Sequence, residues 1–174
     1  MKGCIHIYCG DGKGKTSAAL GLAIRAAGRE KKVLLVRFLK NDDSGELVVL
    51  NTIPQVSIFP CEKSFGFVFR MTQAEKKAAA VFYRDYFARA CREAVELAYD
   101  IVIFDELTAA CNYQMVPEAD ILQFLAARPE TMEVVITGRQ PGEALTAAAD
   151  YVSEIKMIRH PYPNGLAARE GIEY

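Results

Sequence analysis

The sequence contains little histidine and no closely spaced cysteine pair, which leaves no pattern for a zinc site. The two histidines are His6 and His160, and the five cysteines stand at positions 4, 9, 61, 91 and 111 without a C-x-x-C pair. Structural zinc sites require ligands at short, regular spacings. We therefore interpret the cysteines as buried or incidental free thiols in a reducing compartment.

Long apolar runs and a strong net charge are also missing. No stretch is long enough to span a bilayer, and no signal peptide precedes the first predicted strand. The formal net charge is -1 at pH 7, which gives no electrostatic reason to expect a nucleic acid or an anionic membrane as the main partner. We expect a cytoplasmic protein with neither kind of partner.

A glycine-rich loop is the most informative feature that the sequence does contain. It joins a predicted strand at residues 4–9 to a predicted Ala-rich helix at residues 16–27, with Gly28 placed to end the helix. Strand, glycine loop and helix in this order are typical of a phosphate-binding loop, although Cys9 stands where the strict pattern has glycine. An ordinary glycine turn is the alternative.

In a phosphate-binding loop, glycines let backbone N–H groups turn inward around phosphate oxygens, and the helix N-terminus adds further donors. Lys15 is expected to bind the outer phosphates of a nucleotide, and the Thr16 hydroxyl is expected to bind Mg²⁺. The predicted nucleotide-binding residues are Gly10, Asp11, Gly12, Lys13, Gly14, Lys15, Thr16 and Ser17.

Short apolar runs alternate with helical patterns along the rest of the chain. Strands are predicted at residues 4–9, 33–38, 56–59, 101–104, 134–137 and 151–156. A long helix begins after Thr72, which forms a capping box with Glu75; further helices are predicted from Pro117 to before Arg128 and at residues 143–149. The long helix is expected to place six residues in the core, namely Tyr83, Phe87, Ala90, Ala94, Leu97 and Ala98.

This alternation predicts an α/β protein with three layers and a mostly parallel sheet, the P-loop NTPase (RecA-like) fold. The chain has 174 residues, about the length of one domain, and it shows no repeat, low-complexity tract or linker. We expect a single domain over residues 1–174.

Asp105 and Glu106 follow directly after the apolar run at residues 101–104. In a P-loop fold this strand is expected to lie beside the P-loop strand, and an acid at its end helps to hold Mg²⁺. The alternatives are that Asp105 caps the next element or that Glu106 faces solvent. The spacing does not decide which acid is the ligand, so Asp105 and Glu106 both join Thr16 as candidate metal-binding residues.

Arg139 follows Thr137 and Gly138 at the end of the fifth predicted strand. A side chain there points toward the same edge of the sheet as the nucleotide, and it could contact phosphate or a second substrate. A surface arginine or a structural ion pair is the alternative.

Taken from end to end, these motifs resemble the P-loop family of ATP:corrinoid adenosyltransferases. The resemblance is carried in order by residues 10–19, 37–40, 45–46, 66–69, 105–108, 127–129, 137–139, 149–150 and the tail from His160-Pro161 to Gly171-Ile172-Glu173. The Asp-Glu-Leu-Thr stretch and this tail are more selective than the glycine loop.

The resemblance implies transfer of the 5′-deoxyadenosyl group of ATP to the cobalt(I) of a corrinoid, with release of triphosphate. It implies ATP, Mg²⁺ or Mn²⁺, a corrinoid substrate, a flavoprotein reductant and a homodimer. Catalytic roles fall on Lys15, Thr16 and Glu106, and Phe67 and Phe69 occupy the segment that displaces the axial ligand of cobalt(II).

Typical members of the family carry Trp at the position of Phe69. From the residues alone, Phe67 and Phe69 are expected to fill the local core, as buried phenylalanines usually do. Two other functions stay open: a generic P-loop ATPase or kinase, and a non-catalytic ATP-dependent corrinoid-binding protein.

Overall fold

The computed structural model describes residues 2–40, 44–66, 68–161 and 165–172. Its six strands are β1 (Ile5–Cys9), β2 (Val33–Arg37), β3 (Val56–Ile58), β4 (Ile101–Asp105), β5 (Glu133–Thr137) and β6 (Tyr151–Glu154). Its helices are α1 (Lys15–Ala27), α2 (Gly45–Leu50), α3 (Gln73–Glu96), α4 (Leu107–Asn112), α5 (Glu118–Ala127), α6 (Glu143–Ala147) and the 3₁₀ turn η1 (Val68–Arg70). Within the described ranges, none of the helices combines the length and the apolar character that spanning a bilayer would require.

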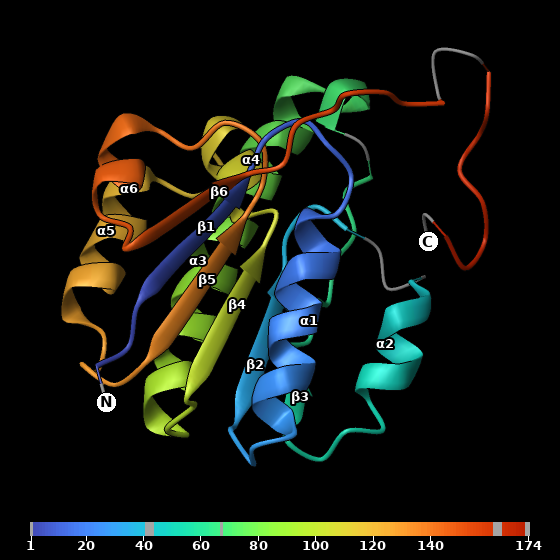
Figure 1. Cartoon of the computed structure of the whole chain (residues 1–174). Helices are drawn as coiled ribbons and strands as arrows, with labels where there is room; N and C mark the ends of the chain where they lie inside the picture. The colour runs from blue at the N-terminus through green and yellow to red at the C-terminus, as the bar shows by residue number, and fades with distance from the viewer. Residues whose placement is uncertain (1, 41–43, 67, 162–164, 173–174) are drawn as a thin grey trace.

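All six strands form one parallel sheet in the order β3-β2-β4-β5-β1-β6 (Figure 1). The expectation that β4 lies beside the P-loop strand is wrong, because β5 pairs with β1 on one side and with β4 on the other. One strand therefore separates the P-loop strand β1 from the strand β4 that carries the acidic pair. As a consequence, Thr137 at the end of β5 lies next to Asp105 and Glu106.

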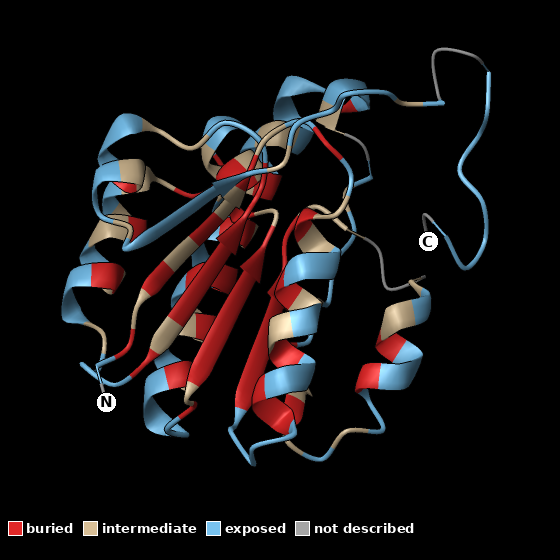
Figure 2. Cartoon of the chain, in the orientation of Figure 1, coloured by how far each residue is buried: buried red, intermediate tan, exposed pale blue. Residues whose placement is uncertain are grey.

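Helices cover both faces of this sheet, as the three-layer prediction requires. α1 and α2 pack on one face, and α3, α4, α5 and α6 supply the apolar residues of the other face. The central strands β2 and β4 are buried along their whole length, whereas the edge strand β6 is exposed (Figure 2). A fully covered parallel strand reads as a continuous apolar run, which is why these strands were readable from the sequence.

The long helix α3 begins at its predicted N-cap. The Thr72 hydroxyl accepts a hydrogen bond from the Glu75 N–H, and the Glu75 carboxylate accepts one from the Thr72 N–H. The core prediction holds for the helix interior but is wrong for Leu97, which is 51% exposed, and for Ala98, which is exposed. Helical spacing stops at Glu96, and the left-handed φ of 51° at Ala98 turns buried Tyr99 into the core instead.

Three short elements have no counterpart in the sequence prediction: α2, α4 and η1. Each is six residues or fewer, too short to show a helical period. α4 matters for the site, because it begins directly after the acidic pair and fixes the direction in which the chain leaves β4.

Candidate functional site

The predicted phosphate-binding loop runs from the end of β1 into α1. Gly14 precedes the helix with a φ of 120°, a conformation that favours glycine, and a Cβ there would have no neighbour within 4 Å. Lys15 is only 8% exposed, and its Nζ donates a hydrogen bond to the Gly12 carbonyl oxygen over 2.8 Å. Burial lowers the pKa of Lys15. The ammonium is thus drawn back onto its own loop.

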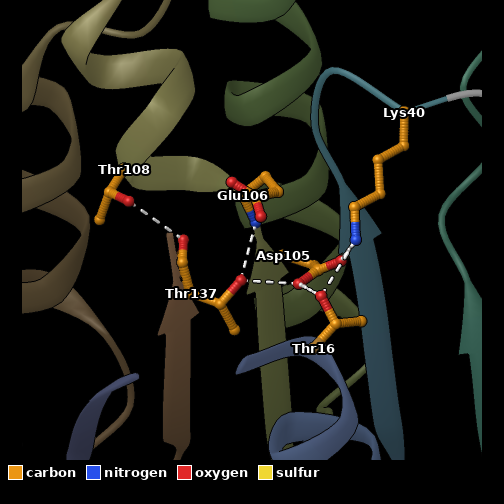
Figure 3. A network of polar contacts seen from close by, with 6 residues as sticks. All are labelled: Thr16, Lys40, Asp105, Glu106, Thr108 and Thr137. Atoms are coloured by element: carbon orange, nitrogen blue, oxygen red, sulfur yellow. Dashed lines mark hydrogen bonds and ion pairs between the residues drawn. The ribbon is translucent and has the colours of Figure 1, made fainter. Parts of the chain in front are cut away.

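Asp105 is the centre of a polar network at the carboxyl edge of the sheet (Figure 3). Its side chain is 1% exposed, yet it accepts hydrogen bonds from the Thr16 hydroxyl at 2.9 Å and from the Thr137 hydroxyl at 2.6 Å. The Lys40 ammonium forms an ion pair with its other oxygen. The P-loop helix and the acid of β4, widely separated in the sequence, therefore meet directly.

The two acids after β4 have different surroundings. Glu106 adopts a left-handed φ of 62° at the start of α4, and its backbone N–H donates to the Thr137 hydroxyl at 2.9 Å. Burial and the neighbouring charge of Asp105 raise the pKa of Glu106. The hydrogen bond to Thr16 belongs to Asp105, so the geometry distinguishes two residues that spacing left equivalent.

Two members of this network, Thr137 and Lys40, had no role predicted from the sequence. Thr137 receives the Glu106 N–H and donates to Asp105, so one hydroxyl orients both acids. Lys40 reaches back from the chain after β2 and donates to the Thr16 hydroxyl at 3.1 Å. Their positions could have indicated this role: Thr137 ends β5 and Lys40 follows β2, and polar side chains at the carboxyl ends of parallel strands converge on one edge of the sheet.

The first half of the glycine loop is held by the chain that leaves β6. The Gly12 N–H donates to the Ile155 carbonyl at 2.8 Å, and Asp11 accepts the Met157 N–H at 2.9 Å. A Cβ on Gly12 would lie 2.7 Å from that carbonyl oxygen, so the glycine permits this close approach. Gly12 is one of the predicted nucleotide-binding residues, and in this structure its N–H is already bonded to the chain after β6.

The remaining predicted residues differ in how they lie. The hydrogen bond from the Met157 N–H lowers the pKa of Asp11, as burial lowers the pKa of Lys15, and the positive charge of exposed Arg139 adds to both effects. Lys13 and Ser17 are also exposed. Gly10 has a φ of 101° and packs against Ile155, like Gly12.

The aromatic segment lies before α3. Phe67 is outside the described residues. Phe69 is 78% exposed on η1, with the Arg70 guanidinium 5.5 Å from its ring centroid. It does not fill the local core; that role falls to Phe65, whose ring lies 5.5 Å from Phe82. Phe65, Gly66, Arg70, Met71 and Glu75 line a hollow of about 270 Å³ there.

The chemistry of the network suits a divalent cation. Thr16 Oγ1 and Asp105 Oδ1 lie 2.9 Å apart, and the Lys40 ammonium contacts the same hydroxyl and the other oxygen of the Asp105 carboxylate. Mg²⁺ and Mn²⁺ prefer hydroxyl and carboxylate oxygens and fill their remaining positions with phosphate and water oxygens. The residues present therefore fit such a metal bound together with a nucleotide.

Comparison with solved structures supports the fold. A KaiC-like protein from Pyrococcus horikoshii OT3 superposes with a TM-score of 0.55 over 89% of this chain and 73% of that chain, at 12% sequence identity. At this identity the likeness concerns the fold alone. Together with the six-stranded parallel sheet, it confirms the P-loop NTPase (RecA-like) prediction.

Comparison with known sequences reaches further. A corrinoid adenosyltransferase of Escherichia coli K12 is 36% identical over 99% of this chain and 86% of its own length. The corrinoid adenosyltransferase CobA of Salmonella typhimurium LT2 is 34% identical over the same shares. The family model of the ATP:corrinoid adenosyltransferases BtuR/CobO/CobP matches residues 1–174. The chain therefore belongs to the ATP:corrinoid adenosyltransferase family of transferases.

Proposed function

We propose that this enzyme joins the 5′ carbon of ATP to the cobalt(I) of a corrinoid and releases inorganic triphosphate. In this step the cobalt electron pair forms the Co–C bond, the C5′–O bond breaks, and its electron pair leaves on the triphosphate oxygen. Family membership supports transfer of an adenosyl group between ATP and a corrinoid. The observation that carries the proposal is the direct contact of Thr16 with Asp105, which joins the P-loop to the acidic strand.

The side chains at this edge suit a reaction in which negative charge gathers on the leaving group. Lys15 lies on the loop, and its ammonium would stabilise the outer phosphates once it leaves the Gly12 carbonyl. Exposed Arg139 adds positive charge from β5. We assign Thr16 and Asp105 to hold the metal, and Thr137 to keep Asp105 in place. Bound Mg²⁺ or Mn²⁺ would neutralise triphosphate charge as a Lewis acid.

Cobalt(I) is itself a strong nucleophile, so this reaction requires alignment of cobalt, carbon and leaving oxygen rather than a general base. Glu106 lies next to Asp105 and its pKa is raised, so its protonation would set how much negative charge the site carries. Exposed Phe69, beside the hollow at Phe65 and Met71, would meet the corrinoid face. We further propose a flavoprotein reductant for cobalt, a homodimer and a cytoplasmic location, where the five free cysteines would stay reduced.

The phosphorus product tests this proposal. Attack at the 5′ carbon leaves all three phosphates joined, whereas phosphoryl transfer separates one or two of them. We expect phosphorus NMR of an anaerobic reaction with Mg²⁺, ATP and chemically reduced cobalamin to show triphosphate equal to the adenosylated corrinoid formed. ADP as the stoichiometric product would instead identify an ATPase or kinase, and binding of both ligands with no product would identify a binding protein.

A further inference from the structure

Lys40 occupies an unusual place for a lysine. Its ammonium donates to the Thr16 hydroxyl at 3.1 Å and pairs with Asp105, so it contacts both side chains that we assign to the metal (Figure 3). Its own side chain is 25% exposed, whereas that of Asp105 is 1% exposed. The lysine therefore supplies the positive charge that a buried carboxylate requires.

A second ion pair shows that β2 and β4 can be linked by a lysine and an aspartate without any contact to the P-loop. Lys31 and Asp100 precede the same two strands, and they pair at 2.8 Å with side chains 56% and 35% exposed. The two pairs thus join the same strands at opposite ends. Only the pair at the carboxyl edge also involves Thr16 of the P-loop helix. What distinguishes Lys40 is its contact with the candidate metal-binding residues.

An ammonium and a divalent cation cannot share these oxygens. Mg²⁺ lies 2.0–2.1 Å from its ligands, roughly an ångström closer than a hydrogen-bonded ammonium. Both cations at Thr16 and Asp105 would be in contact and would repel each other strongly in a buried site. Binding of the metal therefore requires the Lys40 ammonium to leave, and its long flexible side chain permits that.

We propose that Lys40 is a positioning residue that holds Thr16 and Asp105 in the nucleotide-free enzyme and yields this place to the metal of the incoming metal–ATP complex. The inference rests on the ATP-binding part of the proposed function. Lys40 then sets how strongly nucleotide binding depends on the metal. With Lys40 present, the charge of Asp105 is neutralised when metal-free ATP binds. Without Lys40, the unpaired Asp105 carboxylate would repel metal-free ATP and weaken its binding. Metal–ATP would then bind more tightly, because no ammonium competes with the metal for Thr16 and Asp105.

Nucleotide binding without corrinoid, where no turnover occurs, tests the inference. The affinity for ATP is measured by calorimetry with excess Mg²⁺ and again with EDTA, in the wild-type protein and in Lys40→Met, which keeps the apolar stem. We expect the ratio of the affinity with Mg²⁺ to the affinity with EDTA to be at least about tenfold higher in Lys40→Met than in the wild-type protein. A tenfold rise corresponds to a wild-type protein in which Lys40 occupies the metal position in about nine-tenths of the free molecules. Lys40→Gln, which keeps a donor without the charge, should raise the ratio in the same direction if Lys40→Met folds poorly.

Lys31→Met is the matched control, because it breaks the equivalent ion pair at the other end of β2 and β4. It should leave the ratio unchanged. An unchanged ratio in both Lys40 variants would overturn the inference. If stability fell at the same time, Lys40 would be part of a structural ion pair. If both affinities fell by the same factor, Lys40 would be a simple phosphate ligand. A wild-type protein that binds neither form of ATP would contradict the proposed function itself.

Discussion

At the scale of single residues, the site is organised around one buried charge. Asp105 receives two hydroxyl hydrogen bonds and one ammonium, from Thr16, Thr137 and Lys40. These donors come from α1, β5 and the chain after β2, so three elements are fixed relative to one carboxylate. Because an unpaired buried charge is costly, each donor helps to hold the next in place.

Lys15 gives the most direct test of the phosphate site. Replacing Lys15 with Ala removes the ammonium that would stabilise the leaving triphosphate, and we expect turnover to fall by about 10²-fold or more and ATP to bind more weakly. Initial rates with saturating ATP and cobalt(I) corrinoid measure the effect, with Lys31→Ala as a control outside the site. Near-normal turnover of Lys15→Ala would remove the catalytic role of the loop.

Phe69 tests the corrinoid assignment. Its ring is exposed, so Phe69→Ala should change the free energy of unfolding by no more than about 0.5 kcal/mol. If the ring displaces the axial ligand of cobalt(II), the variant should lose activity from cobalt(II) with a mild reductant and keep most of it with pre-formed cobalt(I).

Two further variants at this segment separate packing from function. Phe69→Trp, which restores bulk, should retain the cobalt(II) route. Phe65→Ala is the packing control: it removes the contact with Phe82 and should lower the melting temperature and both activities. Equal losses in both assays for Phe69→Ala would contradict the assignment of Phe69 to the corrinoid.

At the scale of elements, the sequence was informative wherever a pattern was long or chemically constrained. The apolar runs of β2 and β4, and the Thr72–Glu75 capping box of α3, identified those elements directly. The short helices α2 and α4 carry no such pattern. The contacts between the glycine loop and the chain after β6 could not be predicted for another reason. Gly12 and Asp11 bond to Ile155 and Met157, more than 140 positions away in the sequence.

The contact with the chain after β6 leads to a prediction for Asp11, which the sequence assigned to nucleotide binding. Asp11→Ala removes the acceptor of the Met157 N–H, a hydrogen bond worth about 0.5–1.5 kcal/mol. We expect amide hydrogen exchange at Met157 to speed up by roughly two- to tenfold, while Ala18 in α1, bonded to Gly14, keeps its rate. An unchanged exchange rate at Met157 would show that the hydrogen bond between Gly12 and Ile155 keeps the chain after β6 in place without Asp11.

At the scale of the whole molecule, strand order was the part of the fold that the sequence left undetermined. Alternating strands and helices predicted a parallel three-layer sheet, but the same pattern is compatible with β4 next to β1 or with β5 between them. The choice depends on which strands pair, and all the central strands are similarly apolar. The insertion of β5 is what brings Thr137 next to Asp105, where it shares the carboxylate with Thr16.

Because the proposed nucleotide site joins β1, α1, β4 and β5, a ligand there should stabilise the folded chain as a unit. A ligand at 100 times its dissociation constant adds about 2.7 kcal/mol, which for a chain of this size corresponds to a rise in melting temperature of about 5–10 °C. We expect this rise with Mg²⁺ and ATP, measured by differential scanning calorimetry without corrinoid. Lys15→Ala should lose most of the rise, and Lys31→Ala should keep it, since Lys31 lies at the amino ends of the strands. Equal rises in the two variants would mean that ATP binds away from the loop. The charged residues around Asp105 would then have to bind a ligand other than ATP.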